Sequence, residues 1–266
     1  MRRRNVKAGK ITFWVEQEGK GAPLVVIHGG PGVNHQYFHP HLGLLAEFCE
    51  VVYYDLRGQG GSSPAPQEED YGLLQDVEDV EKLRQSLGLE KIHLLGHSYG
   101  GYVALEYATQ YAEHTRTAIL CSVPIGESEE EINRRSDEIW NSLQRLYPGE
   151  DIFYRFYFRK PVSEKTRYYN DVVRKDYAHP QTRKVLEAYA KDTYMVHPYL
   201  ALSLIPCPIY LLYGRHDPLC NIELIQNLSE QYPRTRLILF EESGHDPFAD
   251  EPEYFARVMK KIISGC

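Results

Sequence analysis

The chain has 266 residues, 42% of them hydrophobic, a size that favours one α/β domain with an insertion over two independent domains. Its formal net charge of −7 argues against a nucleic-acid partner. The basic start MRRRNVK has no apolar stretch behind it, and no uncharged apolar run reaches the roughly 18 residues of a transmembrane helix, so we expect no signal peptide and no membrane anchor.

The first part of the chain alternates short apolar runs with loops that contain glycine. Residues 11–19 alternate in polarity, as an edge strand does. Continuous apolar runs, which are typical of strands buried on both faces, follow at 23–29, 50–55 and 91–97. Between the last two runs, residues 75–89 carry apolar side chains at helical spacing, with acidic residues early and basic residues late.

The same alternation continues towards the C-terminus. Further buried strands are predicted at 116–122 and 208–214, and a last strand at 235–242. Helical patterns occupy residues 101–114 and 253–263. Together these elements predict an α/β fold with a mostly parallel, doubly wound sheet and helices on both of its faces.

One long stretch, residues 125–204, interrupts this alternation. It carries charged and aromatic residues at helical spacing, with helices predicted at 127–146 and 182–196, but no convincing parallel strand. A connection of this length between two strands is usually functional. We therefore predict a helical cap, or lid, inserted into a core that is formed by residues 1–124 and 205–266.

The segment GHSYG, residues 96–100, fits the pattern G-x-S-x-G, with a predicted strand before it and a predicted helix after it. A nucleophile on so sharp a turn has a strained backbone, and its neighbours are too crowded for a Cβ atom, which accounts for the glycines. The amino end of the following helix favours negative charge at this point. We predict that Ser98 is a catalytic nucleophile.

A serine nucleophile needs a base, and the base needs an acid that orients it. Asp217 stands just past the predicted strand at 208–214, and His245 stands just past the strand at 235–242. Strand ends are where an α/β sheet presents its active site. The order Ser98, Asp217, His245 is that of a catalytic triad on this kind of sheet.

Other titratable residues in these loops compete for the same roles. Glu127, just after the strand at 116–122, is an alternative acid. His216 is interpreted as an ordinary loop residue. Asp246 either binds a substrate group or, as we expect, is a solvent-exposed acid of a turn.

The run VVIHGGPG, residues 25–32, has neither the glycine spacing of a dinucleotide site nor the lysine of a phosphate-binding loop. A tetrahedral intermediate needs two amide donors for its oxygen. The residue after the nucleophile, Tyr99, supplies one amide in this type of site, and the loop at HGGPG supplies the second. We assign the second donor to the amide of Gly30, with Gly29 as the fallback, and expect His28 to anchor the loop.

Two further groups of polar residues have simpler interpretations. Asp55 and Arg57 lie in a second glycine-rich loop and are expected to form an architectural ion pair or hydrogen bond beside the site. Three neighbouring histidines suggest a metal cluster, but no carboxylate or second histidine pair stands at ligand spacing, so we expect no metal site at His35, His39 and His41.

The motifs HGGPG, DLRGQGGSS, GHSYGG, GRHDPLC and ESGHDPF together resemble those of the α/β-hydrolase superfamily, over essentially the whole chain except the insertion. HGGPG and GRHDPLC resemble more narrowly the proline iminopeptidases, which remove an N-terminal residue, often proline, from peptides. The resemblance implies the α/β-hydrolase fold and an aminopeptidase activity.

Some positions depart from the iminopeptidase pattern. The elbow of those enzymes is typically G-G-S-W-G, where this chain has GHSYG. Their cap carries a tryptophan-glutamate segment that helps to hold the free amine of the substrate, whereas Trp140 is followed here by Asn141. The acidic residues that begin the predicted helix at 127–146, including Glu127, are the alternative amine ligands, or else form a solvated acidic face.

The insertion is rich in aromatic residues, among them Tyr154 and Tyr157. These side chains pack the cap onto the core, or line an apolar pocket above Ser98 that receives an acyl or aromatic group. Both tyrosines, together with Gly29 and Glu127, are our candidates for substrate binding.

From the sequence we expect a serine hydrolase that works through an acyl-enzyme, most simply an iminopeptidase-like aminopeptidase acting on a small molecule or short peptide. A carboxylesterase, thioesterase or lactonase is the alternative, and a non-catalytic binding protein on the same fold a remote one. No cofactor or metal is expected, and the protein is expected to be a monomer or small homo-oligomer. The five cysteines are dispersed and odd in number, which favours free thiols and a cytoplasmic location.

Overall fold

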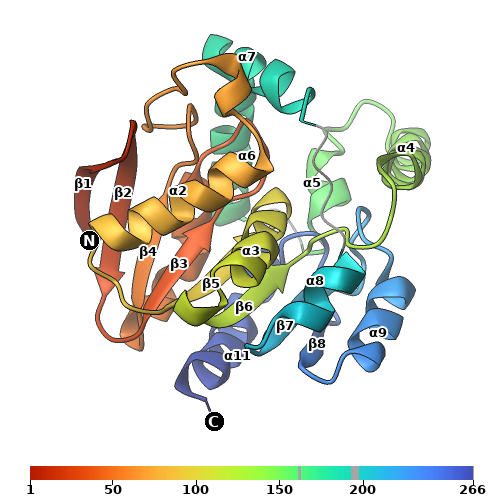
Figure 1. Ribbon diagram of the computed structural model, residues 1–266. Helices are drawn as coiled ribbons and strands as arrows, with labels where there is room; N and C mark the ends of the chain where they lie inside the picture. Colours follow the sequence, from red (N-terminus) through yellow and green to blue (C-terminus); the bar gives the residue numbers. More distant parts are fainter. Residues whose placement is uncertain (161–162, 193–197, 266) are drawn as a thin grey trace.

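The computed structural model describes residues 1–160, 163–192 and 198–265. Eight strands form one sheet in the order β1-β2-β4-β3-β5-β6-β7-β8 (Figure 1). The pairs β1–β2 and β2–β4 are antiparallel, and every other pair is parallel. The predicted fold class is confirmed. The strands are β1 Arg2–Ala8, β2 Ile11–Gly19, β3 Pro23–Ile27, β4 Glu50–Tyr54, β5 Ile92–His97, β6 Thr115–Cys121, β7 Ile209–Gly214 and β8 Thr235–Phe240.

Helices cover both faces of the sheet. One face packs against α2, α3, α8 and α9, and the other packs against α11 (Figure 1). The short helices η1, α1, η2 and α10 lie with α11 in the second core. The α-helices are α1 His39–Leu42, α2 Leu73–Ser86, α3 Tyr99–Gln110, α4 Glu129–Leu146, α5 Phe153–Tyr157, α6 Glu164–Tyr177, α7 Pro180–Tyr189, α8 Pro198–Leu204, α9 Ile222–Gln231, α10 Pro247–Asp250 and α11 Pro252–Ser264. Short 3-10 helices are η1 His35–Phe38, η2 Gly43–Glu47, η3 Glu68–Asp70 and η4 Ala112–His114.

The central strands are continuously apolar because each of their faces meets its own hydrophobic core. In β5, Leu94 belongs to the core beneath α2 and α3, whereas its neighbour Leu95 belongs to the core beneath α11. Successive residues of a strand point to opposite faces, so a strand between two helical layers needs apolar side chains at both. This is why the runs were legible as strands in the sequence.

The first strand was not predicted. In β1 only Val6 and Ala8 are buried, and the remaining residues are half-buried or exposed, so the segment has no apolar pattern of its own. Its order comes from its pairing with β2, where the register places Arg2 opposite Gln17 and Ala8 opposite Ile11. Such pairing depends on a partner strand, and the composition of MRRRNVK does not signal it.

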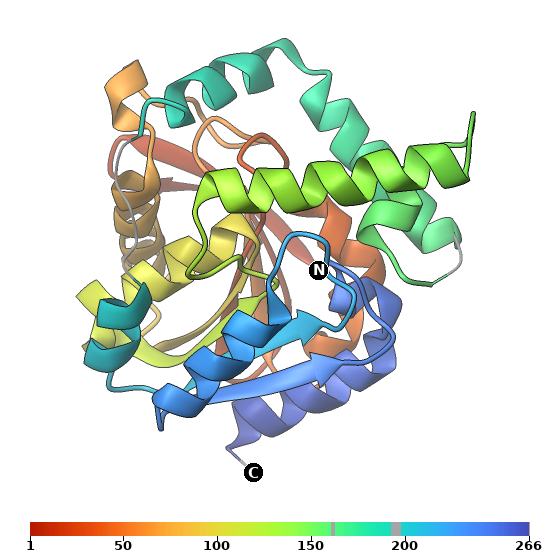
Figure 2. The same cartoon turned by 90° about the vertical axis from the view of Figure 1, so that its right-hand side faces the viewer.

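The long connection between β6 and β7 is helical, as the sequence predicts. The helix expected at 127–146 is α4, Glu129–Leu146. The helix expected at 182–196 is α7, which begins at Pro180 and ends at Tyr189, and residues 193–196 lie outside the described residues. Figure 2 shows α4 running over the loop that follows β7. The side chain of Arg135 on α4 donates hydrogen bonds to the carbonyls of Pro218 (3.2 Å) and Leu219 (2.6 Å) in that loop.

The last helix of this connection has a different place from the others. The buried residues Ala201 and Leu202 of α8 belong to the same core as α3. Helix α8 therefore lies with the helices that cover the sheet, although the sequence grouped it with the cap. Among the described residues, no helix combines the length and the apolar composition that crossing a bilayer requires.

Candidate active site

Ser98 occupies the turn between β5 and α3. Its backbone has φ 50° and ψ −121°, a conformation that side-chain-bearing residues rarely adopt. The amide of Ser98 donates a hydrogen bond to the carbonyl of Cys121 at the end of β6 (2.9 Å), which ties the turn to the neighbouring strand. Ser98 is half-buried and lies at the carboxyl edge of the sheet, directly after β5. Strained backbone of this kind persists where the surroundings fix it, and it gathers at functional sites.

The glycines of the turn are required by close contacts. A Cβ atom on Gly96 would lie 2.2 Å from the carbonyl oxygen of Gly100, and one on Gly100 would lie 2.3 Å from the carbonyl oxygen of Ile27. Both separations are far inside van der Waals contact. The G-x-S-x-G spacing therefore reflects the tight packing of this turn against β3.

Asp217 and His245 come together at the ends of β7 and β8. Both carboxylate oxygens of Asp217 lie 3.0 Å from Nδ1 of His245, and the amide of Leu219 donates to Oδ1 of Asp217 (2.9 Å). Both residues are buried. The amide of His245 donates to the carbonyl of Tyr157 in α5 (2.9 Å), so the histidine loop is also bonded to the insertion.

The charges of this pair support each other. Burial raises the pKa of a carboxyl, but the charge and the hydrogen bond of His245 outweigh it and hold the pKa of Asp217 below its usual range. Burial likewise lowers the pKa of an imidazole, yet the charge and hydrogen bond of Asp217 raise the pKa of His245 above its ordinary value. The carboxylate therefore stays ionised and keeps a proton on Nδ1, which leaves Nε2 as the basic nitrogen.

The HGGPG loop lies directly beside Ser98. A Cβ atom on Gly29 would lie 3.2 Å from Cβ of Ser98, so this loop and the nucleophile turn are in contact. The amide of Gly29 donates to the hydroxyl of Tyr37 (2.7 Å), and the amide of Gly32 donates to Oε1 of Gln59 (2.6 Å). Proline at position 31 has no amide hydrogen. Among the described residues, Gly30 carries the one glycine amide of the loop without a hydrogen bond to the protein.

Comparisons with known proteins identify the family. The family model described as the alpha/beta hydrolase fold matches residues 22–252. The chain belongs to the alpha/beta hydrolase fold family.

Individual proteins similar to this chain include proline iminopeptidases and an esterase. The chain is 27% identical to a proline iminopeptidase of Saccharolobus solfataricus, over 92% of this chain and 86% of that protein. Among solved structures it is similar to a proline iminopeptidase of Mycobacterium smegmatis, with a TM-score of 0.78 and 21% identity over 99% of this chain and 98% of that one. It is also similar to the esterase EaEST from Exiguobacterium antarcticum, with a TM-score of 0.76 and 23% identity over 98% of each chain. The resemblance of the sequence to proline iminopeptidases is confirmed by such relatives.

In this α/β hydrolase, the residue before the serine joins three parts of the site. Nδ1 of His97 lies 2.9 Å from the hydroxyl of Tyr37, the same hydroxyl that receives the Gly29 amide. Nε2 of His97 lies 3.2 Å from the carbonyl oxygen of His245, and the two imidazole rings are 5.0 Å apart. His97 is buried, and burial holds its pKa well below the usual range, so the ring is neutral. Polar contacts of His97 and Tyr37 therefore connect the turn that carries Ser98, the HGGPG loop and the loop that carries His245.

The residue after the serine has a buried polar partner of its own. The hydroxyl of Tyr99 donates to Oδ2 of Asp76 on α2 (2.7 Å), and Tyr189 on α7 donates to the same oxygen (2.8 Å). Asp76 is fully buried, and burial raises its pKa to about 7. This contact bonds the insertion to the helix that precedes the nucleophile strand, and pattern reading did not find it.

Glu127, a candidate acid and a candidate substrate ligand in the sequence, pairs with Arg135 of α4. One carboxylate oxygen contacts Nη1 of the guanidinium, and the other lies 2.9 Å from Nη2 and accepts the amide of Asn221 (3.1 Å). A bidentate pair of this kind holds both groups in a fixed geometry. It connects α4 to the loop that carries Asp217.

The two tyrosines of the insertion lie in different surroundings. The Tyr157 ring is 5.8 Å from the His245 ring, so it borders the candidate base. The hydroxyl of Tyr154 accepts a hydrogen bond from Asn170 within the insertion (3.1 Å). A cavity of about 220 Å³ opens beside these elements, lined mainly by Tyr147, Arg155, Phe156, Phe158, His216 and Gly244. It reaches the residues that immediately precede Asp217 and His245, and its walls are aromatic and basic.

Asp246 corrects one expectation. It is fully buried and is not the exposed turn acid that the sequence favoured. The hydroxyl of Tyr169 on α6 donates to its Oδ1 (3.0 Å), and Nε2 of His97 lies 3.4 Å from the same oxygen. Burial raises the pKa of Asp246 to about 7, although the charge of His245 acts in the opposite direction. The aspartate is covered because α6 of the insertion packs over the loop, which neighbouring residues in sequence do not reveal.

The anchoring roles expected for the other loop residues agree with their contacts. Nε2 of His28 accepts the amide of Leu56 (3.0 Å), and its Nδ1 lies 2.7 Å from the carbonyl of Gly29. Arg57 forms an ion pair with Asp79 of α2, with Nε and Nη2 each 2.7 Å from a carboxylate oxygen.

The three histidines after the HGGPG loop do not form one cluster. His35 and His39 meet each other across the carboxylate of Glu16 on β2, a residue that the sequence analysis did not single out. His41 is buried elsewhere, with its ring 6.0 Å from that of Phe248. The sequence places position 16 on an edge strand, where an acidic residue is common. The contact forms because η1 and α1 fold over β2, and the sequence pattern does not predict it.

Proposed function

We propose that this α/β hydrolase is a serine hydrolase that cleaves a small amide or ester through an acyl-enzyme. The observation that carries the proposal is the buried Asp217–His245 pair, together with a serine of positive φ whose preceding residue, His97, has its Nε2 3.2 Å from the carbonyl oxygen of His245. Nucleophile, base and orienting acid come from three strand ends of one parallel sheet, where this architecture places reacting groups.

In the proposed reaction, Nε2 of His245 takes the proton of Ser98 as Oγ attacks the carbonyl carbon of the substrate. Asp217 holds the tautomer and stabilises the imidazolium that forms. The amides of Tyr99 and Gly30 donate to the developing oxyanion. His245 then protonates the leaving group, and a water molecule, deprotonated by the same imidazole, releases the acyl group and restores Ser98.

For the substrate, we propose an iminopeptidase-like aminopeptidase. The chain is similar along nearly its whole length to proteins named proline iminopeptidases, including those of Saccharolobus solfataricus and Clostridium botulinum at 27% identity each. The helices α4 to α7 would then act as the cap that selects the acyl part of the substrate, with Tyr157 beside His245.

A specific contact favours a small ester as the second candidate. An aminopeptidase needs a carboxylate that holds the free amine, and both oxygens of Glu127 already contact Arg135. Glu131, further along the same acidic run, closes the first turn of α4 by accepting from the amide of Ser128 (2.9 Å). An ester substrate would not require such a carboxylate.

The two candidates differ in which synthetic substrate is turned over. We expect hydrolysis of proline 2-naphthylamide, and we expect loss of that activity when the proline nitrogen is acetylated, because a blocked amine cannot pair with a carboxylate. Turnover of p-nitrophenyl acetate or butyrate without any turnover of proline or alanine naphthylamide would replace the aminopeptidase with the esterase.

Glu127→Gln sharpens the comparison. If Glu127 holds the amine, KM for the naphthylamide rises while ester hydrolysis is unchanged. If it serves only to join α4 to the Asp217 loop, both substrates are affected alike. Glu130→Gln, which changes an exposed acid in the first turn of α4, is the matched control.

The activity is expected to depend on pH through His245. The imidazole must be neutral to accept the serine proton, and the charge of Asp217 raises the pKa of His245 above its ordinary value. Activity should therefore be full above that raised pKa and should fall as the pH drops through it, with a midpoint above about 6.5. A kcat/KM profile between pH 5 and pH 9 measures this, and a midpoint well below 6.5 would contradict the assigned pairing.

A further inference from the structure

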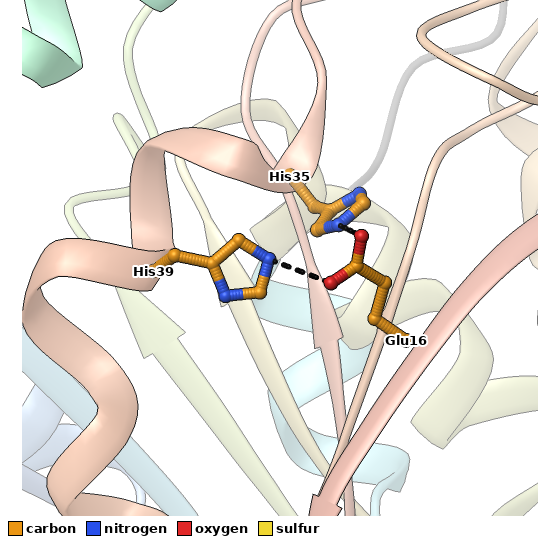
Figure 3. A group of neighbouring side chains, drawn as sticks. All are labelled: Glu16, His35 and His39. Carbon is orange, nitrogen blue, oxygen red and sulfur yellow. Dashed lines mark ion pairs between the residues drawn. The ribbon is translucent and has the colours of Figure 1, made fainter. Parts of the chain in front are cut away.

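Outside the catalytic group, three side chains that are common metal ligands meet in the protein interior. Glu16 lies on β2, His35 on η1 and His39 on α1, and Figure 3 shows both imidazole rings turned toward the carboxylate. Nε2 of His35 is 3.6 Å from Oε1 of Glu16, and Nε2 of His39 is 3.2 Å from Oε2. The ligand atoms of all three residues lie within 4.8 Å of one another.

The atoms that face each other are buried and lack hydrogen bonds. Among the described residues, Nε2 of His35 and Nε2 of His39 make no hydrogen bond. Oε2 of Glu16 makes none either, and its polar neighbours are Nε of Arg3 (3.1 Å) and Nε2 of His39 (3.2 Å). Glu16 and His35 are 3% and 0% exposed. Buried polar atoms in proteins are nearly always bonded, so three such atoms in one place require an explanation. A cation at their centre would be bonded by all three.

The surroundings of His35 are those of a metal ligand. Its Nδ1 lies 2.5 Å from Oδ1 of Asp55, and the same oxygen accepts the His35 amide (3.0 Å). Oδ2 of Asp55 accepts the amide of Gly61 (2.7 Å), so the carboxylate itself is held in place. A carboxylate on one nitrogen fixes the ring and keeps the proton there, which presents Nε2 as the ligand atom.

Trp14 and Arg3 each place a donor nitrogen near a carboxylate oxygen of Glu16. For a metal to bind, only Arg3 has to move away. The indole nitrogen of Trp14 donates to Oε1 (3.1 Å), which leaves Oε2 for a metal. Nε of Arg3 lies 3.1 Å from Oε2, but the arginine side chain is 61% exposed. Ion pairs with so exposed a partner are weak, so Arg3 can turn into solvent. A metal would likewise replace the proton on Nε2 of His35, since imidazole binds metals in its neutral form.

We propose that Glu16, His35 and His39 bind one Zn²⁺ ion, with a water molecule as the fourth ligand. Two imidazoles and a carboxylate are a ligand set that zinc accepts, and tetrahedral bonds of about 2.1 Å place ligand atoms about 3.4 Å apart. The separation of 3.2 Å between Nε2 of His39 and Oε2 of Glu16 is near this value, and the ligand atoms of all three residues lie within 4.8 Å of one another. The side chain of His39 is 18% exposed, which gives the ion a path from solvent.

The site shares no residue with Ser98, Asp217 or His245, so its role is structural. It joins β2 to the segment that follows the HGGPG loop, and through Asp55 to the second glycine-rich loop. Zinc is therefore expected to stabilise the fold and not to take part in bond cleavage.

The test uses the full chain, stripped of metal with a chelator and then titrated with Zn²⁺ by calorimetry. We expect one equivalent to bind and the unfolding temperature to rise with zinc concentration. His39→Gln, which alters the most exposed ligand, should weaken binding by at least about 100-fold, since loss of an outer-shell partner alone costs about 10–100-fold. His41→Gln, a buried histidine two residues along that does not face Glu16, should bind zinc as the unaltered chain does.

Spectroscopy separates this site from the catalytic group, where Asp217, Cys220 and His245 form a second set of possible ligands. Co²⁺ bound to the proposed site should give visible absorption bands that vanish in His39→Gln, and labelling of Ser98 by a fluorophosphonate should continue with zinc present. Absence of a bound equivalent in the unaltered chain would overturn the proposal. So would an equivalent that His39→Gln retains, or one that blocks labelling.

Discussion

The Ser98→Ala variant is expected to lose labelling by a fluorophosphonate probe and to hydrolyse its substrates at least about 1,000-fold more slowly than the unaltered chain. The probe forms a bond with an activated serine oxygen, and this variant lacks that oxygen. Alanine is as large as serine at Cβ and tolerates the same backbone, so the turn with φ 50° should remain folded. Gel fluorescence after labelling, together with circular dichroism, separates loss of chemistry from loss of structure.

The chain offers a matched control for this experiment. Ser122, at the end of the neighbouring strand β6, also has a positive φ of 53° and is fully buried. Ser122→Ala should keep both labelling and turnover. Labelling that persists in Ser98→Ala would show that another residue is the nucleophile, and the proposed acyl-enzyme would then be wrong.

The Asp217→Asn variant should lower kcat by about 10,000-fold with little change in folding, because an amide that donates to Nδ1 of His245 leaves the proton on Nε2, where it blocks proton uptake from Ser98. The remaining activity should also titrate differently. Removing the carboxylate charge removes the main interaction that raises the pKa of His245, so the midpoint of the residual pH profile should move to lower pH.

A second buried aspartate tests the choice of acid. Asp246 adjoins His245 in the chain and lies in the same polar cluster, but its oxygen contacts Tyr169 and His97, not Nδ1 of His245. Asp246→Asn should therefore cost far less activity than Asp217→Asn. The reverse order of effects would transfer the orienting role to Asp246.

The sheet and the proximity of Asp217 to His245 could be predicted from the sequence for one physical reason. Strands between two helical layers must be apolar at every position, so a run such as the one that contains Leu94 and Leu95 is recognisable as a buried strand. In a parallel sheet the carboxyl ends of such strands share one edge. Polar residues that follow those runs, such as Asp217 and His245, are therefore brought together by topology, and their pairing needs no information beyond strand positions.

Contacts that depend on how the covering segments fold were not readable. Asp246 is buried by Tyr169 of α6, which lies 77 positions away in the chain. Glu16 meets His35 and His39 only because η1 and α1 fold over β2. Strand β1 exists through its pairing with β2. In each case the local sequence has no distinctive pattern. The contact is made by a segment distant in the chain, and the local sequence does not indicate which segment that is.

The polar contacts of the turn that carries Ser98 limit how the sequence of that turn can change. His97 and Tyr99, the two variable positions of G-x-S-x-G, are each half of a buried polar pair, with Tyr37 and Asp76 as the other halves. A change of this motif to G-G-S-W-G would leave the Tyr37 hydroxyl and the Asp76 carboxylate short of a partner. Replacing the pentapeptide alone is therefore expected to destabilise the turn. Positions 97 and 99 must change together with their partners on η1 and α2. A library that redesigns this turn should therefore vary positions 37, 76, 97 and 99 at the same time.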